Sequence, residues 1–305
     1  MKVRIGTRGS KLALRQAEEI SEKLRHIHCG LETELVVIKT TGDKVLDAPL
    51  AKIGSKGVFV KEIEEALLEG RIDLAVHSMK DLPSKLPEGL IVGAVPERED
   101  PRDVLISRDG LPFEALPEEG RVGTSSLRRR VQLRRILPRW EVLPLRGNLD
   151  TRLRRLQEGR FDAIVVAAAG LKRLGLVEFL KHPLPPEVML PAAGQGALAV
   201  ECREGDPLTD LLQGIHHPQT ALEVAAERAF LQRMGGGCQV PMGALARFDE
   251  GEVCLKAMVS SLEGDRLFAG EEKGRDPERV GTLLADRLLE KGAREVLEEV
   301  YSRDG

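Results

Sequence analysis

Residues 3–38 read VRIGTRGSKLALRQAEEISEKLRHIHCGLETELVVI, in which two short apolar runs flank a segment of helical period. We expect a strand over Val3–Gly6, a helix from about Lys11 to His26 and a second strand over Leu35–Ile38. Strands that alternate with helices are typical of α/β folds, because a crossover helix brings the chain back to the same edge of a sheet. The pattern therefore predicts an α/β protein with a largely parallel or mixed sheet.

The same alternation continues along the chain and is interrupted by two connectors. A helix is expected over residues 59–69, and strands over residues 72–76 and 90–95. Residues 96–101 read PEREDP, and residues 183–191 hold four prolines. Charged or proline-rich stretches of this kind commonly separate domains. We therefore place domain boundaries at the two connectors.

The connectors predict three domains, of which the first is discontinuous. The apolar run Gly196–Glu201 follows the second connector and is expected to return to the sheet of the first domain. A helix over residues 220–234, two strands over 253–260 and 266–269, and two terminal helices predict a small α+β unit. The expected domains are residues 1–97 with 192–214, residues 98–191, and residues 215–305.

One segment of the chain is strongly basic. Residues 121–160 carry twelve arginines, three acids and no lysine, a local charge of +9 in a chain whose net charge is −3. Guanidinium is a planar fork that binds carboxylate or phosphate through two hydrogen bonds, whereas an ammonium group is a mobile point charge. The segment therefore predicts a surface that binds anions.

Four of these arginines stand at two expected corners between a strand and a helix. Arg128 and Arg129 follow the expected N-cap Ser126, and Arg146 and Arg152 stand at the next corner and its helix. Cations in a first helical turn oppose the helix dipole, at about 0.3–1 kcal/mol each, unless an anion lies there. Open α/β sheets bind ligands at such corners. We therefore expect an anion at these four side chains, with a solvated helix face as the alternative.

The other arginines of the segment and an earlier corner complete this pattern. Thr7–Ser10 joins the first expected strand to the first helix and repeats an arginine at a corner, Arg8, so three corners share one design. Six further arginines of the segment are interpreted chiefly as solvated helix faces, which charge runs usually are. They are Arg134, Arg135, Arg139, Arg154, Arg155 and Arg160.

Asp81 follows the expected strand over residues 72–76 and is a candidate for catalysis. Pro83 disfavours a helical conformation at Leu82, so this segment is expected to be a loop at the carboxyl end of the strand. An aspartate beside Lys80 and opposite many arginines stays ionised, accepts hydrogen bonds from N–H groups and stabilises a developing cation. A turn or capping aspartate is an equally weighted alternative.

Cys238 lies in the glycine-rich run GGGCQVP at residues 235–241. A thiol on such a loop near cations is a candidate nucleophile, and a structural cysteine is the alternative. The cysteines at 29, 202, 238 and 254 show no spacing typical of metal ligands, so we expect no metal. The long stretch Thr40–Gly57 predicts either a lid over the crevice that the arginine-bearing corners would line, or a connection without function.

Composition narrows the class of protein. The sequence begins without the apolar core of a signal peptide and has no apolar stretch long enough to cross a membrane, so we expect a cytoplasmic protein. One tryptophan, one tyrosine and seven phenylalanines leave few side chains for stacking on bases, which disfavours a nucleic-acid-binding protein. An anion-binding protein without enzymatic activity remains a second alternative, because a fold alone does not establish chemistry.

Six segments, in order along the chain, resemble the porphobilinogen deaminase family, also called hydroxymethylbilane synthases. They are TRGSKLAL at 7–14, VHSMKD at 76–81, GTSSLRR at 123–129, LRGN at 145–148, LPAAGQGA at 190–197 and GGCQVP at 236–241. The resemblance implies two lobes like those of periplasmic binding proteins, with mixed sheets, and a small α+β C-terminal domain. It also implies a transferase that condenses four porphobilinogen molecules head to tail into hydroxymethylbilane, with release of ammonia, in tetrapyrrole biosynthesis.

The resemblance further implies roles for individual residues. Cys238 would hold a dipyrromethane cofactor through a thioether, and Asp81 would be the catalytic carboxylate that contacts pyrrole N–H groups. Lys52 and Lys56 lie in a segment that resembles the active-site loop of the family. We expect a monomer with porphobilinogen as its substrate and with no nucleic-acid, membrane or metal partner. The cofactor and substrate carboxylates would be bound by Arg8, Ser10, Lys80, Thr124, Ser126, Arg128, Arg129, Arg146 and Arg152.

Overall fold

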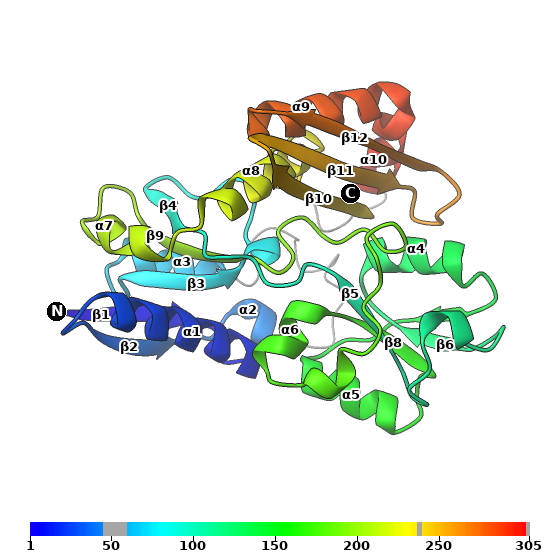
Figure 1. The fold of residues 1–305 in the computed structure, drawn as a ribbon, viewed down its shortest axis with the longest axis horizontal. Coiled ribbons are helices and arrows are strands. Elements are labelled where there is room, and N and C mark those ends of the chain that lie inside the picture. Colours follow the sequence, from blue (N-terminus) through cyan, green and yellow to red (C-terminus); the bar gives the residue numbers. More distant parts are fainter. Residues whose placement is uncertain (45–59, 237–239, 303–305) are drawn as a thin grey trace.

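Three separate sheets organise the described residues of the computed structural model (Figure 1). The structure describes residues 1–44, 60–236 and 240–302. We call the unit around the five-stranded sheet the first lobe, the unit around the four-stranded sheet the second lobe, and the unit around the three-stranded sheet the C-terminal domain. In Figure 1 the C-terminal domain lies above both lobes. The α/β fold class expected from the sequence is confirmed.

The first lobe contains residues from two distant parts of the chain. Its elements are β1 (Lys2–Thr7), α1 (Lys11–Ile27), β2 (Glu32–Val37), α2 (Thr41–Lys44), α3 (Lys61–Leu68), β3 (Leu74–Ser78), β4 (Leu90–Ala94), β9 (Leu198–Arg203) and α7 (Leu208–Leu212). The strand order is β2-β1-β3-β9-β4, in which β1 is parallel to β2 and β3, and β9 is antiparallel to β3 and β4. Apolar residues of α1, such as Ile20, pack on Ile5 of β1 in a buried core. The predicted return of the chain to this sheet is confirmed by β9.

The second lobe follows β4 and carries most of the arginines. Its elements are β5 (Asp103–Ser107), β6 (Arg121–Gly123), α4 (Leu127–Ile136), β7 (Glu141–Leu143), α5 (Leu149–Gln157), β8 (Ala163–Ala167) and α6 (Ala168–Arg173). The strand order is β5-β8-β6-β7, with β6 parallel to both of its neighbours and β5 antiparallel to β8. Because β6 and β7 run in the same direction, the corners that begin α4 and α5 lie at one edge of the sheet.

The C-terminal domain packs three helices on an antiparallel sheet. Its elements are α8 (Pro218–Arg233), β10 (Met242–Asp249), β11 (Glu252–Ser260), β12 (Leu267–Gly274), α9 (Pro277–Leu288) and α10 (Arg294–Ser302). Sequence analysis predicts no strand over β10, because Gly243, Ala244 and Ala246 have little preference for strands. Pairing with β11 and burial in the core override that local preference.

Glu227 of α8 attaches the C-terminal domain to both segments that connect the lobes. Its buried carboxylate accepts hydrogen bonds from Arg98 Nη1 (2.6 Å) and Nη2 (3.1 Å), and from the Gly194 N–H (2.6 Å). Residue 98 precedes β5 and residue 194 precedes β9. The C-terminal domain is thus held where the chain passes from lobe to lobe. Within the described ranges, no helix has the length and apolar character needed to cross a membrane.

Candidate active site

Asp81 lies on a tight turn at the carboxyl end of β3. The strand ends at Ser78, and a single 3-10 turn over Met79–Asp81 follows. The Leu82 N–H closes the turn on the Met79 carbonyl (3.2 Å), and Leu82 itself is extended, as the proline after it requires. The sequence predicts a loop here, and the structure replaces it with this short turn. The side chain of Asp81 is exposed at the turn.

Asp81 and the corner after β1 line one hollow. Arg8, Ser10 and Ser78 lie in its wall together with Asp81. Ser10 is the N-cap of α1, and its hydroxyl accepts a hydrogen bond from the Ala13 N–H (3.2 Å), which fixes the corner. The structure therefore brings the Arg8 corner and the predicted catalytic carboxylate together.

The corner before α4 buries two arginines. Ser126 is the N-cap of α4 and accepts a hydrogen bond from the Arg129 N–H (3.4 Å), and Thr124 Oγ1 accepts one from the Ser126 N–H (3.2 Å). This capping places Arg128 and Arg129 in the first helical turn, as the sequence predicts. Their exposed fractions are only 5% and 6%. Two buried guanidinium groups in one helical turn require a nearby anion.

Asp103 at the start of β5 supplies that anion. Its fully buried carboxylate lies 2.8 Å from Arg128 Nη1 and 2.7 Å from Arg129 Nη2. Burial alone would raise the pKa of Asp103, but the two guanidinium groups hold it well below its usual range. Burial lowers the pKa of Arg128. The anion inferred from the helix dipole is therefore, in this structure, a carboxylate of the chain itself.

Lys80 reaches the same group of charges through a glutamine. Its Nζ lies 3.4 Å from Gln195 Oε1, and Gln195 Nε2 donates to Asp103 Oδ1 (2.8 Å). Burial lowers the pKa of Lys80 to about 8, and Asp81 acts in the opposite direction. The ammonium group is thus poorly solvated, so a carboxylate bound beside it would stabilise its charged form.

Arg152 lies opposite this group on α5. Its Nε donates to the Gly147 carbonyl (2.8 Å), at a residue whose φ of 103° suits glycine. Burial lowers the pKa of Arg152 to about 10; repulsion from Arg129 adds to this, and attraction to Asp81 opposes it. The neighbouring Arg146 is half-buried.

The site has an excess of positive charge. Four cations face two carboxylates, which leaves a net charge of +2 before Arg8 and Arg146 are counted. The six residues are Lys80, Asp81, Asp103, Arg128, Arg129 and Arg152. A multivalent organic anion is the ligand that such a site favours.

Three predicted site residues lie outside the described residues. Cys238, Lys52 and Lys56 belong to the ranges 237–239 and 45–59, so their roles stay predictions. Helix α8 ends at Arg233, five residues before the cysteine. The helix that precedes Cys238 in the sequence is therefore the one that also carries Glu227.

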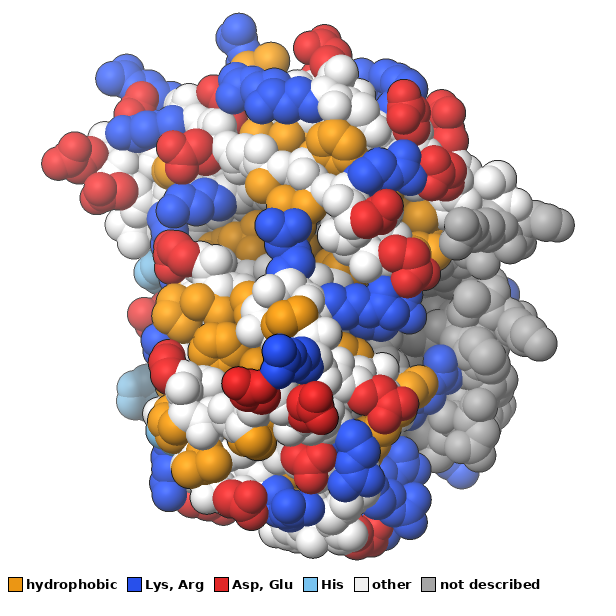
Figure 2. Space-filling model, turned by 90° about the vertical axis from the view of Figure 1, so that its right-hand side faces the viewer, with side chains coloured by type: hydrophobic (Ala, Val, Ile, Leu, Met, Phe, Trp, Pro, Cys, Tyr) orange, Lys and Arg blue, Asp and Glu red, His pale blue; other side chains and the backbone are white. Residues whose placement is uncertain are grey.

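The arginines interpreted as solvated are on the surface, except that Arg155 is half-buried. Four of them pair with acids: Arg134 with Glu263, Arg139 with Glu118, and Arg154 and Arg160 with Glu158. Figure 2 shows one face of the molecule, on which acidic and basic side chains are intermixed. The local charge of +9 is thus divided between buried site residues and surface ion pairs.

Sequence reasoning missed two polar residues of the site. Asp103 is buried at the first position of β5, and Gln195 is 1% exposed between the lobes. An acid at the start of an apolar run was the available signal for Asp103, because an apolar strand that begins with a carboxylate needs a cationic partner. Gln195 lies within a segment of the family resemblance, but its type alone indicates no role.

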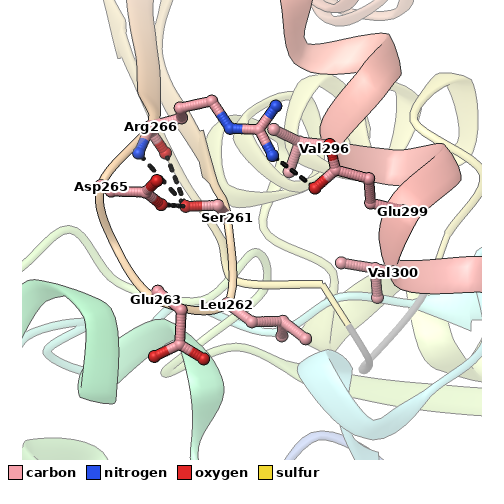
Figure 3. Close-up of a pocket in the computed structure, with 8 residues that line it drawn as sticks. All are labelled: Ser261, Leu262, Glu263, Asp265, Arg266, Val296, Glu299 and Val300. Atoms are coloured by element: carbon pink, nitrogen blue, oxygen red, sulfur yellow. Dashed lines mark hydrogen bonds and ion pairs between the residues drawn. The ribbon is translucent and has the colours of Figure 1, made fainter. Parts of the chain in front are cut away.

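A second pocket lies in the C-terminal domain, between the β11–β12 turn and α10 (Figure 3). Arg266 pairs with Glu299 across it, and Ser261 bonds Asp265 within the turn. Figure 3 shows these polar groups directed at one another. The lining holds three acids, Glu263, Asp265 and Glu299, against the one arginine, so its excess charge is negative, opposite in sign to that around Asp81.

A two-lobed α/β fold with a carboxylate facing a group of guanidinium and ammonium charges defines a protein that acts on organic polyanions. The family model described as "Porphobilinogen deaminase, dipyromethane cofactor binding domain" matches residues 3–210, and that described as "Porphobilinogen deaminase, C-terminal domain" matches residues 221–290. A porphobilinogen deaminase of Syntrophobacter fumaroxidans (strain DSM 10017 / MPOB) is 50% identical over 303 residues, which cover 98% of each chain. The chain therefore belongs to the porphobilinogen deaminase family.

Solved structures with lower similarity include two other bacterial proteins. The VFT2 domain of Bordetella pertussis BvgS is 16% identical, with coverage of 70% of this chain and 85% of that one and a TM-score of 0.40. The probable amino-acid ABC transporter extracellular-binding protein ytmK of Bacillus subtilis is 12% identical, with coverage of 70% and 89% and a TM-score of 0.41. Likeness at these TM-scores supports no inference about the function of this chain.

Proposed function

We propose that this chain is a transferase that condenses four porphobilinogen molecules head to tail into hydroxymethylbilane, with release of ammonia. Its membership of the porphobilinogen deaminase family supports the activity. The observation that carries the proposal is the exposed carboxylate of Asp81 in a site with excess positive charge. Porphobilinogen bears an acetate, a propionate and a pyrrole N–H, which are the groups that such a site complements.

A covalently held dipyrromethane fits the described residues. The site has more cations than carboxylates, and the buried Nε of Arg129 has no hydrogen-bond partner among the described residues. Dipyrromethane, when bound, supplies the terminal pyrrole carbon to which the first substrate is joined. We propose Cys238 as its attachment point, because a thiolate is the nucleophile that forms a thioether. The glycines before it give the backbone freedom.

The binding of carboxylate groups is assigned to the corners. Arg8 and Ser10 line the hollow beside Asp81, and Lys80 and Arg152 have pKa values that burial lowers. The acetate and propionate groups of the pyrroles would stabilise the charged forms of Lys80 and Arg152. We further propose that Arg146, Thr124 and Ser126 complete this set, and that Arg128 and Arg129 bind through N–H groups not directed at Asp103.

Asp81 is assigned the chemical step. Its carboxylate accepts the pyrrole N–H of the substrate and stabilises the cation that develops on the substrate as ammonia leaves. The same carboxylate is placed to assist proton transfer at the pyrrole nitrogen. We also propose that one chain acts alone, because the lobes of a single chain supply these side chains. The cytoplasm is proposed as its location.

Intact-protein mass spectrometry and an assay of porphobilinogen consumption test the proposal together. We expect purified protein to carry a mass excess equal to two linked pyrroles. Asp81→Ala should fold, retain that excess and lose nearly all turnover, because the binding residues are intact and the carboxylate is gone. Near-normal turnover by Asp81→Ala refutes the assigned role. Binding of porphobilinogen without any turnover by the wild-type chain would instead indicate an anion-binding protein.

A further inference from the structure

Arg228 extends from the C-terminal domain to the segment that follows Asp81. Its Nη2 donates to the carbonyls of Pro83 (2.7 Å) and Ser84 (3.1 Å). Its Nη1 donates to the Leu82 carbonyl (3.4 Å) and lies 3.8 Å from the sulfur of Met79. One guanidinium group on α8 thus contacts the backbone of three successive residues of the first lobe.

The partners of Arg228 are unusual for a half-buried cation. Among the described residues it forms no ion pair, and its hydrogen bonds end on three backbone carbonyls and the sulfur of Met79. Burial lowers the pKa of Arg228, and Glu201 acts on it only as a more distant charge in the opposite direction. A planar fork suits several carbonyls spaced along a backbone, because its donors are spread over separate nitrogens, whereas the donors of a lysine radiate from a single nitrogen. The contacts therefore fix the position of a backbone segment.

The turn that carries Asp81 is held on its other side as well. The Met79 N–H donates to the Ala197 carbonyl (3.0 Å), just before β9. Upstream of Asp81 the backbone is thus attached to the sheet of the first lobe, and downstream it is attached to Arg228. The carboxylate between these two anchors is exposed.

The same helix leads to the cysteine. Gly236 follows α8, and a Cβ placed on it would lie 2.8 Å from Ser84 Oγ. Gly236 therefore lies against the segment whose carbonyls bind Arg228. The end of α8 and the segment after Asp81 are thus in contact at two places, Arg228 and Gly236.

We propose that Arg228 is a positioning residue that fixes the Asp81 turn to α8, so that the carboxylate keeps one position relative to the corner after β1, which lines the same hollow. This inference rests on the function proposed for Asp81 and Cys238. Because Arg228 acts through backbone carbonyls, its loss affects the chemical step more than substrate binding. A displacement of about 1 Å at a reacting group costs about 100-fold in rate.

Three variants of the full-length protein test the proposal. Arg228→Met keeps the bulk of the side chain and removes every donor, and Arg228→Lys keeps the charge without the fork. Arg233→Met is the matched control, because Arg233 lies on the same helix but is exposed and pairs with Asp286 within the C-terminal domain. Each variant is measured for bound pyrroles by mass spectrometry, for thermal midpoint, and for kcat and KM with porphobilinogen.

We expect Arg228→Met to carry the cofactor and to lose about 100-fold in kcat with KM changed less than about threefold. Arg228→Lys should lie between this variant and the wild type, and Arg233→Met should match the wild type. Unchanged kcat in Arg228→Met, or a rise in KM alone, overturns the proposal. If Arg228→Met does not fold, Arg228→Lys decides by the same criteria.

A double-mutant cycle separates this inference from the proposed function. If Arg228 acts through Asp81, Arg228→Met should have little further effect on the residual rate of Asp81→Ala. A second loss of about 100-fold in the double variant shows that Arg228 acts elsewhere and overturns the positioning role. Normal turnover in Asp81→Ala instead refutes the catalytic role of Asp81 and the positioning role with it.

Discussion

The carboxylate of Asp103 lies 2.7 Å from Nη2 of Arg129, and both side chains are buried. Removal of the charge leaves Arg129 and its neighbour Arg128 without their shared anion. We therefore expect Asp103→Asn to lower the free energy of unfolding by about 3–5 kcal/mol. Urea unfolding measures this loss. Glu118→Gln, which removes the exposed partner of Arg139, is the control and should cost at most about 1 kcal/mol. Equal losses in the two variants would contradict the buried role of Asp103.

Lys80 predicts a pH dependence of activity. Burial lowers its pKa to about 8, so the free enzyme loses this positive charge as the pH rises through that value. We expect kcat/KM for porphobilinogen to fall on the alkaline side of about pH 8, because substrate carboxylates lose a cationic partner. In Lys80→Arg the guanidinium stays charged, so that fall should disappear. An identical alkaline limb in Lys80→Arg would assign the fall to a different group.

Glu64 on α3 predicts a pH dependence of stability. Burial, and then repulsion from Glu201, raise the pKa of its carboxyl group to about 7 from an ordinary value of 4.5. The folded state thus binds this proton more tightly than the unfolded state, and the protein loses stability as the pH rises between those two values. Glu64→Gln has no titrating group at this position, so it should not lose stability in this way.

Urea unfolding at about pH 5 and about pH 8 measures this effect. Relative to the wild type, Glu64→Gln should gain up to about 3 kcal/mol between the two conditions. Glu65→Gln, which changes an exposed neighbour, should gain almost nothing. A stability difference between Glu64→Gln and the wild type that does not change with pH would show that Glu64 titrates normally.

Cys238→Ser tests the attachment of the cofactor. A hydroxyl is a far weaker nucleophile than a thiolate, so we expect protein without covalently bound pyrrole and without turnover. Intact-mass measurement decides the result, and Cys254→Ser is the control, because that residue lies on β11 in the C-terminal sheet. A retained mass excess in Cys238→Ser would identify another residue as the anchor.

The sequence predicted the local features of the fold and site better than the distant ones. The capped start of α4 follows from serine and apolar periodicity within a few residues and is confirmed, and the loop expected after β3 is a short 3-10 turn followed by the extended Leu82 that Pro83 requires. The partner of Arg128 and Arg129 is 25 residues earlier in the chain, on a strand edge that only the folded sheet brings close. No pattern of residues near Arg128 and Arg129 in the sequence indicates their contact with Asp103.

The carbonyl contacts of Arg228 were unpredictable for a related reason. An arginine that binds backbone oxygen atoms has no complementary residue type in the sequence, so charge patterning cannot indicate it. Strand β10 was missed because its small residues gain strand structure only through pairing with β11. In each case the decisive interaction is tertiary.

The place of β9 in the first sheet has a consequence for biosynthesis. This strand is inserted between β3 and β4, although about a hundred residues of the second lobe separate it from β4 along the chain. A ribosome releases the N-terminal segment long before it releases Arg203. The nascent first lobe must therefore wait, with a gap in its sheet, until the second lobe has emerged, so the two halves of the crevice mature together.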